Sequence, residues 1–587
     1  MKCLRTCILI LISLLLAGCA EKKTSVGMFP LDDHPLVDFY VPSEAESTYH
    51  YLLYTMYRLH GDDQKALEHF QMSIGASPSP SAELLMELSA IYSLQHDQER
   101  AISVLEQAVA LNPYDPNLYK LLSLYYYQEY DFLRARDAIT RAIDLGQTSG
   151  EDFLFLADVL EKIGDYESMV QVLHQLTLEH TDNYVAHYSL GVAFYRQQRY
   201  DDAARSIRTA MEIRGGDTLS YRFMLGKLRL EQGYLDQALD IYEEIYRSSL
   251  PMDTQIATGY SMRIMETLHE YGHYDLSIKL AKRMLQDNPS WIWTVDYCTL
   301  GLYAMQTNAV PDECNGNISL PAGSGHAFTR LLFQYLDTST PEDRAQILHL
   351  LNDSQSQGIL VQSMRPFLDI DKRFGRSQGP KMLLELLQSL AESPREALAM
   401  GITIADMIDN TELQLTYAAD LYEQYPDSVS ALQLAWAHYD SGNLQQAISI
   451  AEPYAKKKDA PAELLNFLGY IMVDHHMQIT VGGNYIRRAV EQESNNPYYI
   501  DSLAWYYYRT RDYTNARIYI ERSIMLLQER DPEPDDAIIF EHTGDILQRL
   551  GDQYRAFAYY ARSYAFRDEP RVFNKMQAIR HSVDAQR

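Results

Sequence analysis

Two histidines and a glutamate, His269, Glu270 and His273, match the pattern H-E-x-x-H. In that pattern the imidazoles lie four residues apart on one face of a helix and bind Zn²⁺, while the glutamate acts as general base in peptide hydrolysis. A catalytic zinc ion needs a third protein ligand, and no later residue in the sequence presents itself as an obvious one. A zinc peptidase with this metal site is therefore one hypothesis for the chain.

Other catalytic signatures are missing from the sequence. Gly226-Lys227 is followed by Leu228, where a phosphate-binding loop requires Ser or Thr, and the three residues lie inside a helical pattern. Gly323-Ser324-Gly325 has the composition of a loop and lacks the spacing of a nucleophile elbow. We therefore expect a binding protein that has no enzymatic activity and no cofactor.

The elements that position these residues are clearest between residues 184 and 213, where the pattern predicts two short helices joined by a tight turn. Gly191 on the first helix and Ala203 on the second are small, which lets the two backbones approach closely. Phe194 and Ile207 are large and would fill the layer toward a neighbouring hairpin. One hairpin cannot bury its apolar face alone, so the rest of the chain must supply neighbours.

The position of Ala203 recurs in two series, at intervals of 34 to 40 residues. The series are Ala66, Ala101, Ala135, Met169, Ala203, Ala238 and Ser277, and then Ala447, Gly482, Ala516 and Ala556. Five residues earlier, at the expected turn, six repeats have a glycine, which tolerates positive φ. These glycines are Gly61, Gly164, Gly233, Gly272, Gly442 and Gly551.

This pattern resembles the tetratricopeptide repeat, and the resemblance covers roughly 400 residues. It implies an all-α fold, a right-handed superhelical solenoid of helix hairpins in two arrays joined by an irregular helical segment. It also changes the interpretation of the H-E-x-x-H motif. Because Gly272 occupies a turn between helices, His273 should lie past the helix end, and the two imidazoles should not converge on a metal ion. We therefore expect no bound metal.

In this family the first helix of each hairpin lines the concave surface, so the register places a set of aromatic and arginine side chains there. The set is Tyr51, Tyr127, Tyr188, Tyr195, Phe223, Trp436, Tyr439, Tyr498, Trp505 and Tyr508, with Arg196 and Arg509. Such residues are the usual anchors of protein interfaces, although each could instead pack against a neighbouring helix. The main hypothesis is a groove for a protein or extended peptide, and a polysaccharide is the alternative ligand.

The N-terminus has the features of an exported lipoprotein. Lys2 and Arg5 precede a short apolar run that is too short to span a bilayer comfortably. Leu16-Ala17-Gly18-Cys19 then resembles the bacterial lipobox, in which the cysteine is acylated and becomes the mature N-terminus. Ala20 follows in place of the aspartate that retains lipoproteins in the inner membrane, so the resemblance implies an outer-membrane anchor facing the periplasm.

The expected organisation follows from these patterns. It is a signal peptide at 1–18, Cys19 and a flexible tether at 19–42, a first array at 43–290, an irregular connector at 291–411 with a loop at 306–325, a second array at 412–566, and a capping helix and tail at 567–587. With 51 basic and 80 acidic residues the net charge is -29, so nucleic acid is excluded as a partner. The chain is interpreted as an envelope scaffold that serves assembly, secretion or export machinery.

Two cysteines would remain in the mature protein. Cys3 and Cys7 leave with the signal peptide, and Cys19 carries the lipid. In an oxidising periplasm, Cys298 on a helix and Cys314 in the following loop are expected to form a disulfide. Two buried free thiols are the alternative.

Overall fold

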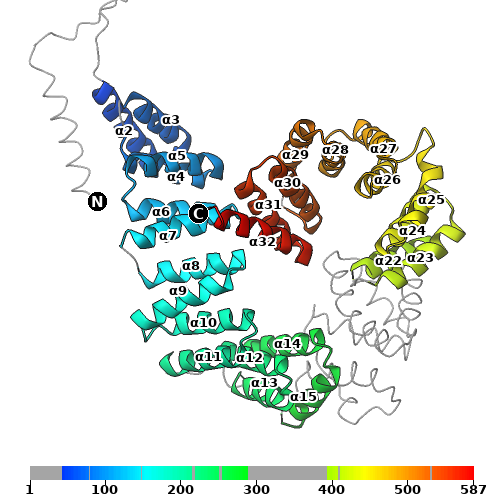
Figure 1. The fold of residues 1–587 in the computed structure, drawn as a ribbon, viewed down its shortest axis with the longest axis horizontal. Coiled ribbons are helices and arrows are strands. Elements are labelled where there is room, and N and C mark those ends of the chain that lie inside the picture. The colour runs from blue at the N-terminus through cyan, green and yellow to red at the C-terminus, as the bar shows by residue number, and fades with distance from the viewer. Residues whose placement is uncertain are drawn as a thin grey trace, which may run out of the picture. The chain divides into compact units, whose positions relative to one another are not determined.

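The computed structural model describes residues 43–287 and 393–586, with short interruptions at 78–79, 147–148, 215–218, 250–253, 408–409, 529 and 531. Within these ranges the chain forms α-helices and one short 3-10 helix, and no β-strand (Figure 1). The expected all-α fold class is therefore confirmed. No helix in this part is long and apolar enough to cross a bilayer.

The helices form two series. The first is α2 (Ser43–His60), α3 (Asp63–Ala76), α4 (Ala82–Leu94), α5 (Gln98–Leu111), α6 (Pro116–Gln128), α7 (Phe132–Asp144), α8 (Gly150–Ile163), α9 (Tyr166–Glu179), α10 (Tyr184–Arg196), α11 (Tyr200–Arg214), α12 (Leu219–Glu231), α13 (Leu235–Ser249), α14 (Thr254–Glu270) and α15 (Tyr274–Asp287). The second is α22 (Pro394–Met407), α23 (Thr411–Gln424), α24 (Ser428–Asp440), α25 (Leu444–Ala455), α26 (Ala462–Asp474), α27 (Ile479–Gln492), α28 (Pro497–Arg509), α29 (Tyr513–Leu527), η3 (Pro534–Asp536), α30 (Ala537–Arg549), α31 (Gln553–Phe566) and α32 (Pro570–Asp584). The chain divides after Ile91 into two compact units, which are described separately below.

Consecutive helices pair into hairpins, and the turn inside many hairpins is left-handed. All six glycines expected in these turns have positive φ, from +70° at Gly272 to +90° at Gly551. The same slot is filled by non-glycine residues in four other hairpins, and these also have positive φ. They are His96, Tyr130, Gln198 and Arg511. The left-handed backbone conformation of the turn therefore occurs also where the residue is not a glycine.

Close approach of the two helices depends on small residues, as the pattern around Gly191 predicted. A Cβ atom added to Gly191 would lie 2.6 Å from Cγ1 of Ile207, sixteen positions later. Gly226 and Gly544 face the rings of Tyr242 and Tyr560 in the same way, each at 2.5 Å. A glycine followed sixteen residues later by a large buried side chain is therefore the packing unit of several hairpins.

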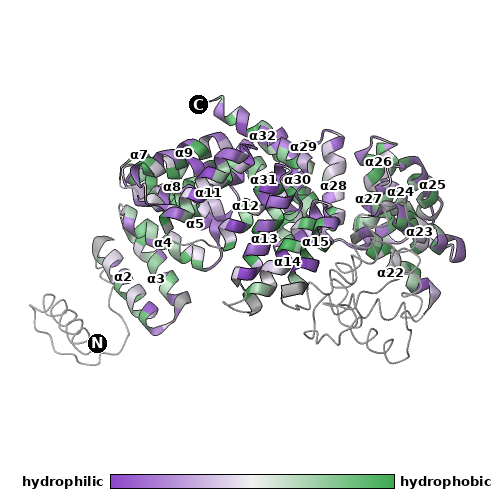
Figure 2. Cartoon of the chain, turned by 90° about the horizontal axis from the view of Figure 1, so that it is seen from below, coloured by the Kyte–Doolittle hydropathy of each residue, from purple (hydrophilic) through white to green (hydrophobic). Residues whose placement is uncertain are grey.

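The hydrophobic core passes from one hairpin to the next. One buried cluster contains residues from Ile139 to Leu228, and the next contains residues from Leu219 to Met284. Every alanine in the two recurring series is buried, and Met169 and Ser277 are buried with them. Hydrophobic residues, coloured green in Figure 2, recur along the helices of both series. A core built from nearest neighbours in this way is the expected property of a helical-repeat array.

Aspartate begins many second helices, and this explains part of the acidic composition. Its side chain accepts the N–H group three residues later, which satisfies one of the unpaired donors at a helix start. The residues that cap helices in this way are Asp62, Asp97, Asp131, Asp165, Asp512 and Asp552. These carboxylates serve the fold and need no partner molecule to account for them.

A hairpin with the same spacing also lies ahead of residue 412. In it, helices α22 and α23 pack together and Gly401 faces Tyr417, again sixteen residues apart, with a Cβ-to-ring distance of 2.7 Å. The signal peptide, Cys19, the tether, loop 306–325, Cys298 and Cys314 lie outside the described residues.

Helix α32 is the expected terminal helix. It packs on α31 through buried residues that include Val572 and Met576. Within the same compact unit it also contacts the turn between α8 and α9. Nε2 of Gln577 donates to the carbonyl oxygen of Ile163 at 2.7 Å, and Arg580 pairs with Asp165 at 3.4 Å. The C-terminal helix thus joins two segments that are about four hundred residues apart in sequence.

Candidate binding surface

The H-E-x-x-H motif is divided by a turn. Helix α14 ends at Glu270, Gly272 has a φ of +70°, and the N–H of His273 donates to the carbonyl oxygen of Leu268 at 2.7 Å. The expected turn is confirmed, and His269 and His273 do not share a helical face. Across the described ranges no group of three His, Cys, Asp or Glu side chains is arranged to hold a metal ion.

A cluster of tyrosines lies on the first helices of the first array. The rings of Tyr188 and Tyr221 stack with centroids 4.5 Å apart and planes 14° apart. The hydroxyl groups of Tyr195 and Tyr271 both donate to Oε1 of Glu231, at 2.9 and 2.6 Å. The structure therefore brings the predicted Tyr188 and Tyr195 of α10 against Tyr221 and Tyr271 of the following hairpins, which the sequence did not single out. The hydroxyl groups of Tyr195 and Tyr271 already have an intramolecular partner.

Lys227 completes this tyrosine cluster. Its Nζ lies 5.7 Å from the ring centroid of Tyr195 and 5.9 Å from that of Tyr271, within the range of cation–π attraction. Burial raises the pKa of both phenols, and hydrogen bonding to Glu231 acts in the same direction. Both tyrosines therefore stay neutral at physiological pH and act as hydrogen-bond donors.

The other predicted residues of the first array differ in exposure. Phe223 is only 5% exposed, and the guanidinium of Arg263 covers its ring at 4.3 Å. Tyr127 is half-buried against Phe132. Arg196 is exposed and pairs with a carboxylate at 3.1 Å. Phe223 is thus a packing residue, whereas Arg196 is accessible to a ligand.

A second aromatic cluster lies on α24 and α26. The ring centroid of Trp436 lies 4.3 Å from that of Phe467, and Tyr439 meets both rings edge-on at 6.0 and 6.2 Å. His475 closes the row, with its ring 5.8 Å from that of Tyr439. Trp436 remains 36% exposed although Phe467 and Tyr439 fix its position. Trp436 is the most exposed of the predicted aromatic side chains in the second array.

Trp505 lies further along the same array and is buried. Only 6% of its surface is exposed, its ring stacks on His542 at 4.0 Å, and its Nε1 donates to Oδ1 of Asp474 at 2.9 Å. Tyr508 stacks on its other side at 4.8 Å. Arg509 also contacts Asp474, through the carbonyl oxygen. Trp505 therefore anchors α28 to its neighbours rather than presenting a surface.

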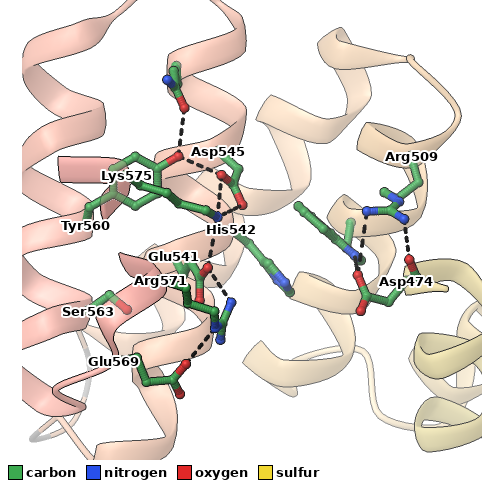
Figure 3. A network of polar contacts seen from close by, with 12 residues as sticks. Asp474, Arg509, Glu541, His542, Asp545, Tyr560, Ser563, Glu569, Arg571 and Lys575 are labelled. Carbon is green, nitrogen blue, oxygen red and sulfur yellow. Dashed lines mark hydrogen bonds and ion pairs between the residues drawn. The ribbon is translucent and has the colours of Figure 1, made fainter. Parts of the chain in front are cut away.

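A network of charged side chains connects α30, α31 and α32 and lies next to the buried Trp505 and His542 (Figure 3). Nζ of Lys575 lies 2.8 Å from Glu541 and 2.7 Å from Asp545. Arg571 contacts Glu541 as well, and the hydroxyl of Tyr560 donates to Asp545 at 2.6 Å. The two carboxylates come from α30, the phenol from α31 and the two cations from α32. The network therefore fixes the relative positions of three helices.

His542 sits between the network and Trp505. Its Nδ1 lies 2.8 Å from Oδ2 of Asp501, and both side chains are almost completely buried. Burial opposes the charged imidazolium, but the charge and hydrogen bond of Asp501 outweigh it and raise the pKa of His542. Burial likewise opposes the charge of Lys575, yet its carboxylate neighbours raise the pKa of that amine. Both cations are stabilised by their anionic partners.

The predicted set thus separates into two groups. Phe223 and Trp505 are buried packing residues, and the remaining members are half-buried or exposed. Sequence reasoning missed Asp501, Glu541 and His542, which supply the charged interior. A usable signal was present, because Glu541 and His542 stand in an otherwise apolar helical pattern and polar residues there require partners.

Two of the remaining predicted residues are also held by neighbours. Tyr498 donates to Asp536 at 2.9 Å. Tyr51 belongs to the first compact unit, where its hydroxyl lies 3.5 Å from Glu87. Neither contact was visible in the sequence, because the acidic partner is more than thirty residues away in each case.

Comparisons with known proteins are consistent with this architecture. The tetratricopeptide-repeat profile matches residues 82–115 and 154–218, and no curated protein matches the sequence. Among solved structures, MamA from Desulfovibrio magneticus RS-1 is 17% identical with a TM-score of 0.27, over 30% of this chain and 100% of that one. YrrB, a TPR protein with an unusual peptide-binding site, is 18% identical with a TM-score of 0.28, over 33% and 97%.

A longer match is the Naa15/Naa10 complex bound to HypK-THB, which is 12% identical with a TM-score of 0.31 and covers 92% of this chain and 96% of that one. The two matched segments and the hairpin register of the structure carry the assignment without these neighbours. The chain is a helical-repeat scaffold that carries tetratricopeptide repeats.

Proposed function

We propose that this chain is a lipid-anchored scaffold of the bacterial cell envelope that binds a protein or an extended peptide. The observation that carries the binding proposal is the exposed indole of Trp436 on α24. Phe467 and Tyr439 fix this indole from two sides, at 4.3 and 6.0 Å between ring centroids. An aromatic side chain that is already immobilised loses little conformational entropy on binding, which is the property of a strong interface anchor.

The buried residues around this surface have a supporting role in the proposal. Trp505, His542 and the carboxylates of α30 hold neighbouring first helices in fixed positions. A rigid support keeps the exposed residues aligned, so a partner need not order them on binding. Trp505 and Phe223 therefore contribute to binding only indirectly.

The test is capture of partners from crosslinked cell envelopes by the full chain. Trp436→Ala should reduce capture of a specific protein about tenfold or more, the effect of losing a hot-spot side chain worth about 2 kcal/mol. Tyr114→Ala is the control, because Tyr114 is even more exposed but lies between α5 and α6, away from the cluster. Equal capture by both variants would refute the proposal, and retention of a polysaccharide without any protein would favour the alternative ligand.

The anchor is a separate part of the proposal and rests on the lipobox resemblance around Cys19. Cells that express the Cys19→Ala variant should show no incorporation of labelled fatty acid into the protein, which should also leave the outer-membrane fraction. The unaltered chain should be labelled and should fractionate with outer membranes. Undiminished labelling of the variant would remove the anchor from the proposal and leave the binding surface unaffected.

A further inference from the structure

Helix α2 has apolar side chains on two faces. One face packs inward, where Tyr54 is buried against the ring of Phe70 at 4.3 Å. The opposite face presents four large apolar side chains to solvent. They are Tyr49, Leu52, Met56 and Leu59, which are 59%, 49%, 42% and 75% exposed, and we call this row the outer seam.

The spacing of the outer seam is that of a helix–helix interface. Its members follow one another at intervals of three, four and three residues, which is the a/d spacing of a coiled coil. The first helix of a repeat array normally has a polar outer face, because no further repeat covers it. A contiguous apolar row in this position is therefore the mark of a surface that is covered by another helix.

We propose that the outer seam binds the outer seam of a second copy of this chain, with the two α2 helices antiparallel. In that arrangement Tyr49 of one copy lies opposite Leu59 of the other, and Leu52 lies opposite Met56. The same four residues are used in both copies, which is the self-complementarity that a two-fold interface requires. Each apolar side chain of the seam is therefore covered by another member of the seam, without a contribution from a different protein.

The helix dipoles support the antiparallel direction, because they oppose each other in it, which is favourable. Parallel packing would instead place like residues opposite each other along the whole seam.

A membrane surface is a poor occupant of the seam. Helix α2 contains two glutamates and one arginine, Arg58, which already pairs with Glu87 at 3.0 Å. Helices that lie on anionic bilayers have basic polar faces, because lysine and arginine supply the attraction to the headgroups. Helix α2 lacks the basic polar face that such binding requires.

The chain's own residues 28–41 are the other candidate occupant, since eight of these fourteen are apolar. Pro30 and Pro35 interrupt this stretch, and proline breaks the interior of a helix. Knobs-into-holes packing along a seam with three-four spacing requires a helix as partner. A second α2 meets this requirement, whereas residues 28–41 do not.

The first test is the mass of the full chain in detergent, by light scattering that separates protein from micelle. The unaltered chain should be a dimer at about 10 μM, in the range of affinities given by small interfaces. The Leu52→Glu variant should be a monomer, because dimer formation would bury two unpaired carboxylates, one from each copy, at the centre of the seam. Ile518→Glu on α29 is the control with similar exposure, and it should remain a dimer.

Crosslinking decides the direction and the occupant. In a full chain with Cys298 and Cys314 changed to serine, Tyr49→Cys with Leu59→Cys should give an inter-copy disulfide, and Leu59→Cys alone should not. A crosslink by Leu59→Cys alone would overturn the antiparallel arrangement. A monomer before substitution, a Leu52→Glu dimer, or crosslinks from α2 to residues 28–41 of the same copy would overturn the interface itself.

Discussion

The residue in the turn of many hairpins has a positive φ, and the energetic cost of that conformation depends on the residue type. Gly233 and five other glycines reach positive φ at little cost because they have no Cβ atom. Gln198 occupies the equivalent position with a φ of +60°, where a residue with a Cβ atom is strained by about 1 kcal/mol or more. The repeat architecture imposes this conformation whichever residue is present.

Replacing Gln198 by glycine should therefore stabilise the first array. The expected gain is about 1 kcal/mol in the free energy of unfolding, since the strain at positive φ is removed. The measurement is urea unfolding of the full chain followed by circular dichroism. Gln198→Ala is the control, because it keeps the Cβ atom and should give no gain. An equal gain in both variants would show that the side chain and not the backbone is responsible.

Gly544 tests the close approach of two helices. A Cβ atom at this position would lie 2.5 Å from the ring of Tyr560, which is completely buried and hydrogen-bonded to Asp545. Gly544→Ala should lower the free energy of unfolding by about 1–3 kcal/mol, the usual cost of overpacking.

Gly259→Ala is the matched control for that substitution. Gly259 also lies inside a helix, and nothing comes within 4 Å of an added Cβ atom. Alanine there should stabilise the protein by up to about 1 kcal/mol, through its higher helix propensity. Destabilisation of similar size by both substitutions would contradict the packing argument.

At the scale of the elements, the second array is held by charges as well as by apolar contacts. The pair of His542 and Asp501 joins α30 to α28, and Lys575 joins α32 to α30. Removing one partner from such a buried pair leaves an uncompensated charge, which typically costs about 3–5 kcal/mol. The interior of this array should therefore respond to pH.

The expected pH dependence follows from the raised pKa of His542. Its stabilising charge is fully present below the ordinary value of about 6.5 and is lost as the pH rises through the raised value. The thermal midpoint of the second array should therefore fall as the pH is increased above neutrality. The charges of Asp501, Asp545 and Glu541 set the position of this change, and the hydroxyl of Tyr470 lies 3.4 Å from Nε2 of the imidazole.

His542→Gln should lower the midpoint at pH 6 and should remove most of the dependence above it. Differential scanning calorimetry from pH 6 to 9 measures both effects. Adding Asp501→Asn to the same chain should recover part of the loss, because the unpaired carboxylate is removed as well. A midpoint that falls with pH equally in His542→Gln would assign the dependence to another group.

At the scale of the whole molecule, the two arrays are connected by side-chain contacts as well as by the chain. Besides Gln577 and Arg580, Arg136 on α7 pairs with Asp584 at 2.8 Å. Arg136 and Arg580 are largely buried in these contacts, so salt screens these two ion pairs less than it screens pairs on the surface. The end of the second array thereby stabilises the turn between α8 and α9.

The double variant Gln577→Ala and Arg580→Ala should loosen that turn without unfolding α32. Hydrogen exchange should increase at residues 160–166, because the carbonyl oxygens of Ile163 and Gly164 lose the hydrogen bonds that they accept from Gln577 and Arg580. Exchange should be unchanged in α14. Arg522→Ala is the control, because Arg522 makes its contacts within the second array. Unchanged exchange at 160–166 in the double variant would show that the contact does not persist in solution.

The sequence by itself determined the all-α class and the hairpin register, because small residues and turn glycines recur at regular intervals. Gly272 alone was enough to show that the H-E-x-x-H motif is divided by a turn. The hairpin of α22 and α23 was not recognised in the sequence, since it lacks the turn glycine that marked other repeats. The left-handed turns at Gln198 and Arg511 were also invisible, because neither residue type favours that conformation.

Only the tertiary structure decided which aromatic side chains are exposed. Trp436 and Trp505 stand at similar positions of their repeats, yet one retains an accessible face and the other stacks on His542. The difference comes from the residues contributed by later hairpins, which a repeat pattern read along one chain does not specify. Burial depends on what lies opposite a side chain, whereas register depends only on what precedes and follows it.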